Sequence, residues 1–443
     1  MDHGPRTARA RRRVVATDPS AGRTVQRAVD AAWRIEWPQL VAVLTRLVGD
    51  ITLAEDLAQD AHLTALEQWP RDGVPNNPGA WLTVTAKRRA IDRIRRDTTL
   101  ARKLPLLEGE LLAELSATSD PASIVDGEIP DDLLRMLFTA CHLVLSRTSQ
   151  VALTLRLVGG LTTEEIARAY VTATPTIVRR ISRAKKTIRD ERIPYEVPSG
   201  AELAGRLDAV LEVIYLVFNE GYAATAGDDW MRVDLCTEAL RLARILCALM
   251  PAEPEVHGLA ALLELQASRL RARHDAAGRL VLLRDQDRTR WDRLLIRRGY
   301  AALARSHALA RDRGQAPGRY ALQAAIAAAH AMAATPAETD WRRIAGLYAV
   351  LAARFPSPIV ELNRAVAVAE LHGPAAGLEL VDAVVAAGTI DDYHLLHAVR
   401  GDLLERLGRT AEARAEFRRA ADLTANAAEQ AMLLGRADGH SRT

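Results

Sequence analysis

The stretch GLTTEEIARAYVTATPTIVRRISRAKKTIR, residues 160–189, predicts two helices joined by a short turn. Thr162 or Thr163 caps the first helix, which runs to Ala169 and has glutamates in its first turn. Pro175 fits the start of the second helix, because its missing N–H costs nothing at a first-turn position. The second helix is amphipathic, and the residues of its apolar stripe are Ile177, Ile181, Ala184 and Ile188.

The other faces of this second helix carry a strong positive charge. Clustered lysines and arginines neutralise phosphates, and a helix of this kind fits the major groove of DNA. Arginines can pair with guanine edges, whereas the later lysines suit phosphate contacts. The residues expected to contact DNA here are Thr174, Thr176, Arg179, Arg180, Arg183, Lys185 and Lys186. An ordinary surface helix with a solvated charged face is the alternative interpretation.

The composition limits the class of protein. A chain of 443 residues is too long for one core, and its abundant Ala, Leu and Arg favour helices, so we predict an all-α fold. The formal net charge is only +3, so nucleic-acid binding depends on local patches. The spacing of Cys141, Cys236 and Cys247 supports neither a disulfide framework nor a metal site. No apolar stretch is long enough for a membrane span and no signal-peptide pattern is present, so we expect a cytoplasmic protein.

A second basic segment, AWLTVTAKRRAIDRIRRD, occupies residues 80–97. Its clustered cations suit phosphate neutralisation, and an aromatic side chain beside them can stack on an unpaired base. Trp81 is that aromatic residue, although its spacing to Val84 and Ile91 also fits a core position. The residues expected to contact DNA in this segment are Trp81, Lys87, Arg88, Arg93, Arg95 and Arg96.

Changes in composition along the chain divide it into segments. In chain order, we predict a disordered tail (1–24), a helical domain (25–97), an acidic flexible linker (98–130), a domain with the helix-turn-helix (131–192) and a helical extension (201–443). In the first domain the helices are expected near 25–47 and 53–69 and from Gly79 onward. The 53–69 helix is expected to present Glu55, Asp56, Gln59 and Asp60 outward.

The end of the extension has the small and large residues of a tetratricopeptide helix pair. The residues at this spacing are Gly401, Leu404, Gly408, Ala413, Phe417 and Ala420. Residues 358–387 look like a degenerate copy of the same unit. One unit cannot bury its own apolar face, so neighbouring helical units are expected; an unrelated helical hairpin is the alternative.

A dense group of charged residues surrounds Trp291 in the extension. Its members are Asp285, Asp287, Arg288, Arg290 and Asp292. These residues form either helix-surface ion pairs of little energetic value or a docking surface or ligand pocket. Earlier in the extension, Gly221 is expected to end a helix as a left-handed cap.

The order of these parts resembles the extracytoplasmic-function (ECF) sigma factors of bacterial RNA polymerase. The 25–97 domain carries the D-L-x-Q-[DE] pattern and A-W-L…I-D-x-I-R-R, which resemble region two, and the 131–192 domain resembles region four. The extension, with YLVFNEGY (215–222) and LLRDQDRTRWD (282–292), is similar to one subgroup with a tetratricopeptide-like C-terminal domain. The resemblance implies that the clamp helices of the polymerase bind Asp56, Leu57, Gln59 and Asp60.

The same resemblance implies the partners. The 80–97 segment would engage and help to open the downstream promoter element, and the second helix of the helix-turn-helix would read the upstream element. Core RNA polymerase, through its clamp helices and flap, and promoter DNA are the expected partners, with the acidic linker near the RNA exit path. A third expected contact is docking of the extension on the sigma-like regions. No catalytic residue, cofactor or metal is expected.

Two other functions fit parts of the sequence. A stand-alone regulator with a ligand- or protein-binding helical domain needs the helix-turn-helix but neither the second basic segment nor the acidic helix. A helical-repeat scaffold needs none of the basic patches. A sigma factor is the hypothesis that uses all of these features.

Overall fold

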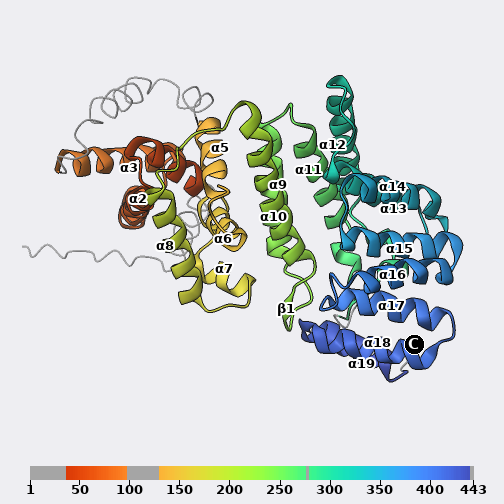
Figure 1. Ribbon diagram of the computed structural model, residues 1–443. Helices are drawn as coiled ribbons and strands as arrows, with labels where there is room; N and C mark the ends of the chain where they lie inside the picture. Colours follow the sequence, from red (N-terminus) through yellow and green to blue (C-terminus); the bar gives the residue numbers. More distant parts are fainter. Residues whose placement is uncertain (1–35, 97–128, 276–278, 440–443) are drawn as a thin grey trace, which may run out of the picture. The chain divides into compact units, whose positions relative to one another are not determined.

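The computed structural model describes residues 36–96, 129–275 and 279–439, and almost all of these residues are helical (Figure 1). The predicted all-α fold is confirmed. The chain divides into two compact units, Met1–Leu133 and Leu134–Thr443. The predicted tail lies outside the described residues, and so does the linker except for its last two residues, which begin helix α5 (Ile129–Ala140).

Besides the first residues of α5, the first unit contains three described helical segments. Residues 36–48 are helical, and the start of this helix lies outside the described residues. Helices α2 (Ile51–Asp72) and α3 (Pro78–Arg96) follow. The Asp50 side chain accepts a hydrogen bond from the amide of Leu53 and so caps α2. Helix α2 is longer at both ends than the predicted 53–69, because this cap lies upstream and Gly73, with φ 88°, lies downstream.

The predicted helix-turn-helix consists of α7 (Thr163–Ala169) and α8 (Thr174–Asp190), preceded by α6 (Arg147–Leu157). Thr162 is the cap of α7: its Oγ1 accepts a hydrogen bond from the amide of Glu165, whose carboxylate accepts one from the amide of Thr162. Pro175 lies in the first turn of α8, as predicted. The buried residues of α8 are Ile177, Ile181, Ala184 and Ile188, which are the four residues of the predicted stripe.

The extension is a succession of helices: α9 and α10 lie near the centre of Figure 1, and the helices from α12 to α19 follow down its right-hand side. They are α9 (Gly200–Tyr222), α10 (Val233–Leu249), α11 (Pro254–Ala267), α12 (Arg293–Asp312), α13 (Arg319–Met332), α14 (Trp341–Arg354), α15 (Pro358–His372), α16 (Pro374–Ala387), α17 (His394–Arg406), α18 (Thr410–Leu423) and α19 (Ala427–Ala437). Short 3-10 helices lie between them at Leu270–Ala272 (η2), Leu283–Asp285 (η3), Arg288–Arg290 (η4) and Pro336–Glu338 (η5). None of the helices in the described ranges is long and apolar enough to cross a bilayer.

Small residues allow consecutive helices of the extension to approach closely. A Cβ on Gly401 of α17 would lie 2.7 Å from the Phe417 ring of α18, and a Cβ on Gly377 of α16 would lie 2.5 Å from Ala369 of α15. The two predicted repeat segments are therefore both helix pairs. Gly221 differs from its prediction: α9 continues to Tyr222, and Gly221 instead makes room for the backbone of α10, since a Cβ there would lie 2.6 Å from the Cys236 amide nitrogen.

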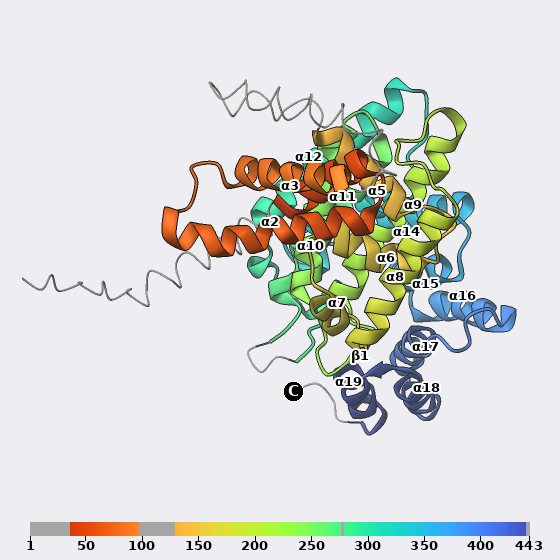
Figure 2. The ribbon, with the colours of Figure 1, turned by 90° about the vertical axis from the view of Figure 1, so that its left-hand side faces the viewer.

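Two short strands join distant parts of the extension, a feature that the sequence pattern did not predict. Strand β1 (Ala226–Gly227) pairs in parallel with β2 (Ala425–Asn426), and both views place β1 beside the last helices (Figures 1 and 2). The Asn426 side chain donates hydrogen bonds to the carbonyl oxygens of Ala224 and Asp229, at 3.2 and 2.9 Å. Asn426 is 1% exposed, so these bonds are protected from water.

Candidate nucleic-acid interface

Helix α8 presents the predicted DNA-contacting residues on its solvent side. Arg179, Arg183 and Lys186 are exposed, whereas Arg180 is half-buried. The other half-buried members of the predicted set are Thr174, Thr176 and Lys185. In the described part of the chain, no carboxylate lies within 4 Å of the cationic groups of Arg179, Arg180, Arg183 or Lys186, so their charges are available to an anionic partner.

The buried side of α8 fixes the direction of these side chains. Helix α8 packs on α6 and α7 through its apolar stripe. Val171, in the turn before α8, has φ 45°, a conformation that is uncommon for a β-branched residue. This packing fixes the rotation of α8 about its own axis, and so it fixes which residues of α8 face solvent.

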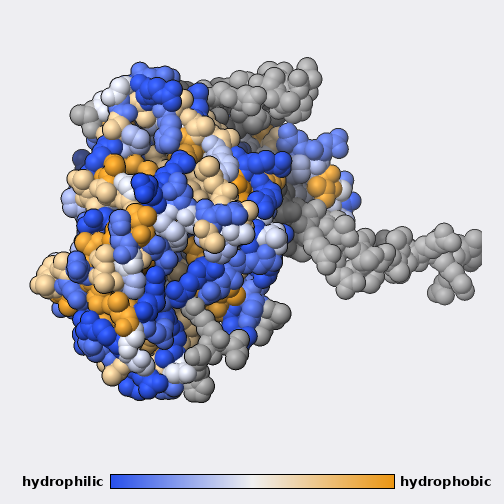
Figure 3. All heavy atoms as spheres, turned by 90° about the vertical axis from the view of Figure 1, so that its right-hand side faces the viewer, coloured by the Kyte–Doolittle hydropathy of each residue, from blue (hydrophilic) through white to orange (hydrophobic). Residues whose placement is uncertain are grey.

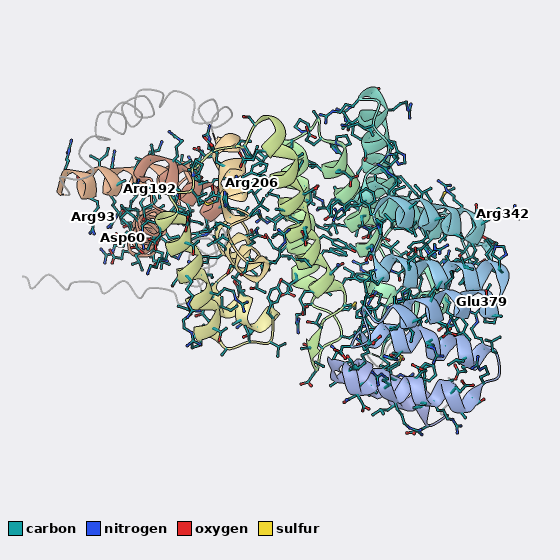
Figure 4. All side chains as sticks on the ribbon, in the orientation of Figure 1. Asp60, Arg93, Arg192, Arg206, Arg342 and Glu379 are labelled. Carbon is teal, nitrogen blue, oxygen red and sulfur yellow. The ribbon has the colours of Figure 1, made fainter. Side chains whose placement is uncertain are left out.

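Three predicted polymerase-binding residues and one predicted downstream-DNA residue, Arg93, lie together between α2 and α3. A hollow of about 400 Å³ lies between these helices. Its lining residues are Leu53, Asp56, Leu57, Asp60, Arg89, Asp92 and Arg93. Figure 4 labels Asp60 and Arg93 at this site. Three carboxylates and two guanidinium groups share one concave surface, which favours contact with a charged protein surface over an apolar ligand.

Arg89 belongs to this surface, although the sequence analysis omitted it. Its Nη2 donates a hydrogen bond to Oγ1 of Thr64, at 2.6 Å, and its Nη1 lies 3.6 Å from a carboxylate oxygen of Asp60. The sequence alone does not show whether Arg88 or Arg89 faces the carboxylates of α2. Only the packing of α3 against α2 distinguishes the two arginines.

The remaining predicted residues of this region differ in exposure. Gln59, Arg88 and Arg95 are exposed outside the hollow, whereas Glu55 is only 3% exposed, so its predicted outward position is wrong. Lys87 is only 4% exposed, so its ammonium group is not presented to DNA here, contrary to the expected basic surface. Trp81 is partly buried and packs edge-to-face on Trp69, with ring centroids 5.4 Å apart. The side chain of Arg96 lies outside the described residues.

The helix-turn-helix domain also contacts the extension within the second unit. Arg241 of α10 donates a hydrogen bond to the carbonyl oxygen of Val158 at the end of α6, at 2.6 Å. Arg206 of α9, which Figure 4 labels, is 5% exposed and donates to the carbonyl oxygen of Phe138 in α5, at 3.0 Å. A Cβ on Gly227 of β1 would lie 3.1 Å from Val171 in the turn.

Four members of the charged group around Trp291 bind backbone groups in the described part of the chain. Asp287 and Asp292 accept hydrogen bonds from backbone amides and cap η4 and α12. Arg288 and Arg290 donate to backbone carbonyl oxygens. In the described ranges no group of three or more His, Cys, Asp or Glu side chains is placed to hold a metal ion.

Comparisons with known proteins match both parts of the chain. Residues 36–99 match the family model for Sigma-70 region 2, and residues 206–307 match a family of unknown function, DUF6596. The Uncharacterized protein R00370 of Rhizobium meliloti (strain 1021) is 44% identical over 407 residues, which cover 91% of this chain and 94% of that protein.

A more distant relative carries a functional name. The Probable ECF RNA polymerase sigma factor SigI of Mycobacterium tuberculosis (strain ATCC 25618 / H37Rv) is 28% identical over 198 residues, which cover 42% of this chain and 67% of that protein. The protein of the same name in strain CDC 1551 / Oshkosh gives the same values. No solved structure matches this chain.

Proposed function

The chain belongs to the extracytoplasmic-function (ECF) family of RNA polymerase sigma factors, and we therefore propose that it directs core polymerase to specific promoters. The α2–α3 domain binds the clamp helices and engages the downstream element. The helix-turn-helix domain binds the flap and reads the upstream element through α8. The observation that carries this proposal is the hollow between α2 and α3, in the segment that matches Sigma-70 region 2.

The combination of two basic surfaces separates this proposal from a stand-alone regulator. A regulator needs one DNA-reading domain and usually a paired half-site. The match of residues 36–99 to Sigma-70 region 2 supports a second, polymerase-dependent domain. We expect little affinity for duplex DNA in the absence of core polymerase.

Co-purification with core polymerase and run-off transcription test the proposal. Asp56→Asn with Asp60→Asn should weaken binding to core polymerase, because both carboxylates line the hollow. Glu67→Gln is the matched control, since Glu67 is exposed on the same helix but does not line the hollow. Failure of the wild-type chain to bind core polymerase, or equal weakening by both variants, would contradict the proposal.

Promoter variants test which residues of α8 read sequence. Arg180→Ala should reduce transcription far more at some upstream sequences than at others, because a guanine pair is worth about 1–3 kcal/mol of discrimination. Lys186→Ala should reduce transcription about equally at all of them, since a phosphate contact carries no sequence information. A uniform loss with Arg180→Ala would assign this residue to phosphate.

We also propose that the extension docks on the helix-turn-helix domain and stabilises it. The last carbonyl groups of a helix lack partners within the helix, and Arg241 supplies a charged donor to one of them at the end of α6. Hydrogen bonds from charged donors contribute about 1.5–3 kcal/mol. Tyr170, beside the turn, supports this contact: burial and then the Glu220 carboxylate of α9 raise its pKa.

A matched pair of substitutions on α10 tests the docking. Arg241→Met should speed hydrogen exchange of the amides at the end of α6 about 10- to 150-fold, because each 1.4 kcal/mol is a factor of ten. Arg244→Met is the control: Arg244 pairs with Glu264, inside the extension, and has no contact with α6 among the described residues. Transcription should fall with the first variant while polymerase binding remains. Equal exchange at the α6 end in both variants would refute the docking.

A further inference from the structure

An unusual group of buried arginines lies behind Trp291 in the extension. Arg269, after α11, is 8% exposed and Arg288, in η4, is 6% exposed. Their guanidinium carbons lie 5.9 and 5.0 Å from the centre of the Trp291 ring. Arg273, which is half-buried, completes the group, with its guanidinium 3.6 Å from the centre of the Tyr222 ring, which Arg269 also approaches at 5.8 Å.

These arginines have no ion-pair partner among the described residues. Arg288 donates from its terminal nitrogens to the carbonyl oxygens of His330 and Ala333 and to the Thr339 hydroxyl. The side chain of Arg269 makes no hydrogen bond in the described part of the chain, and Arg273 points its Nε at the Met231 sulfur. Elsewhere in the extension, buried charges are paired, as Glu264 is with Arg244.

Four buried polar atoms around this group also lack partners within the described ranges. They are Nε of Arg269, Nε of Arg288, Nε1 of Trp291 and Nδ1 of His330. Three of them are obligatory donors, and His330 is 9% exposed. Buried donors without acceptors are costly, so natural proteins rarely retain several of them in one place.

Neighbouring titratable groups respond to the positive charge. Burial and then Arg269 and Arg288 lower the pKa of His330 to about 3. Burial raises the pKa of the Tyr222 phenol, but Arg269 and Arg273 outweigh burial and leave that pKa below its usual range. Burial and then Arg269 lower the pKa of Arg288, and they outweigh the opposite effect of the Glu338 carboxylate. Oε2 of Glu338 accepts a hydrogen bond from the Ala334 amide.

Trp291 also borders an open hollow of about 590 Å³. This volume is in the range of small-molecule sites. The hollow is lined by Arg271, Arg290 and Arg293 together with His274. Its single lining carboxylate belongs to Asp292, and one oxygen of that carboxylate accepts hydrogen bonds from the first amides of α12. The hollow beside Trp291 is therefore cationic, although Arg269, Arg273 and Arg288 do not themselves line it.

We propose that Arg269, Arg273 and Arg288, with the Trp291 indole, form a binding site for a small molecule that carries a carboxylate or phosphate group. The anion supplies the missing charge and accepts hydrogen bonds from donors that now lack acceptors. Arg288 also has a structural role, because its hydrogen bonds connect η4 to the end of α13. Arg269 has no such bonds among the described residues, so a substitution of Arg269 tests ligand binding most directly. This site is separate from the polymerase and DNA surfaces, and the inference stands whether or not they function as proposed.

Thermal unfolding of the full chain with added anions tests the site. Sodium phosphate and sodium citrate are titrated separately, with ionic strength held constant by sodium chloride. At least one of them should raise the Tm of the wild-type chain saturably, because a ligand that binds only the folded state stabilises it. The two titrations distinguish a phosphate from a carboxylate preference.

Two methionine variants complete the experiment. Arg269→Met should abolish the anion-dependent rise, and it should raise the Tm without anion because it removes an unpaired buried charge. Arg319→Met is the control: Arg319 is exposed and lies 5.6 Å from the Phe355 ring, and this variant should keep the full response. If Arg269→Met does not fold, Arg273→Met replaces it. No saturable rise with either anion, or an equal rise in the Arg269 and Arg319 variants, overturns the proposal.

Discussion

Gly401→Ala should destabilise the α17–α18 pair when residue 417 is phenylalanine and stabilise it when residue 417 is alanine. A Cβ on Gly401 would lie 2.7 Å from Cε1 of Phe417, which is fully buried. Overpacking of this kind costs about 1–3 kcal/mol. Alanine gains about 1 kcal/mol over glycine inside a helix. Gly401→Ala should therefore destabilise the pair by up to about 2 kcal/mol.

Replacing Phe417 by alanine removes the ring that a Cβ at position 401 would meet. Phe417→Ala alone should cost about 3–5 kcal/mol, because it empties a fully buried ring position. In that background the added methyl group meets free space, so Gly401→Ala should stabilise the pair by about 1 kcal/mol from helix propensity. The double-mutant cycle should give a coupling free energy of about 1–3 kcal/mol.

Hydrogen exchange measured by mass spectrometry on peptides from α17 and α18 provides the local opening free energy. Gly346→Ala is the control, because no atom lies within 4 Å of a Cβ built on Gly346 in α14. That substitution should have the same effect in both backgrounds. If Gly401→Ala also has the same effect in both, Phe417 does not pack against Gly401 in solution, and the structural reasoning fails.

Three further predictions concern single residues. Thr162→Ala should destabilise the helix-turn-helix domain by about 1 kcal/mol through loss of the capping box, as measured by exchange at α7, whereas Thr163→Ala should cost less. His330 has a folded-state pKa below its unfolded value, so the stability that depends on its neutral form is complete above about pH 6.5 and is lost as pH falls toward 3. The loss should be about 2 kcal/mol at pH 5, and thermal unfolding of His330→Phe at pH 7 and 5 should show a correspondingly smaller pH effect. Asn426→Ala should speed exchange near Ala224, because it removes two buried hydrogen bonds that hold the strand pair; unchanged exchange there would contradict this role.

The helix-turn-helix was predictable because its information is local. The period of the apolar residues in 174–190 specifies one face, and a capping threonine and a first-turn proline specify the ends. The helix pair α17–α18 was likewise predictable from the spacing of Gly401 and Phe417, because these two residues are in direct contact across adjacent helices. Local periodicity is sufficient for such features because the packing partners lie close in the sequence.

Other features depend on contacts that periodicity does not contain. The choice between Arg88 and Arg89 is made by Asp60 on a different helix, and burial of Lys87 depends on the packing of the first unit. The pairing of β1 with β2 joins segments about 200 residues apart and is too short for alternation to appear. The arginines behind Trp291 are spread over 269–288 and look like ordinary surface charges until their burial is known.

The position of the contacts between the helix-turn-helix domain and the extension bears on what the extension does. An extension that blocked promoter DNA would have to cover the basic face of α8. Among the described residues, the contacts fall instead on α5, on both ends of α6 and on Val171 in the turn, while Arg179 and Arg183 stay exposed. If α8 reads promoter DNA as proposed, the extension contacts this domain away from the DNA-reading face. Regulation through it would act by changing how firmly α8 is supported, which is why the Arg241 variant should lower transcription and not raise it.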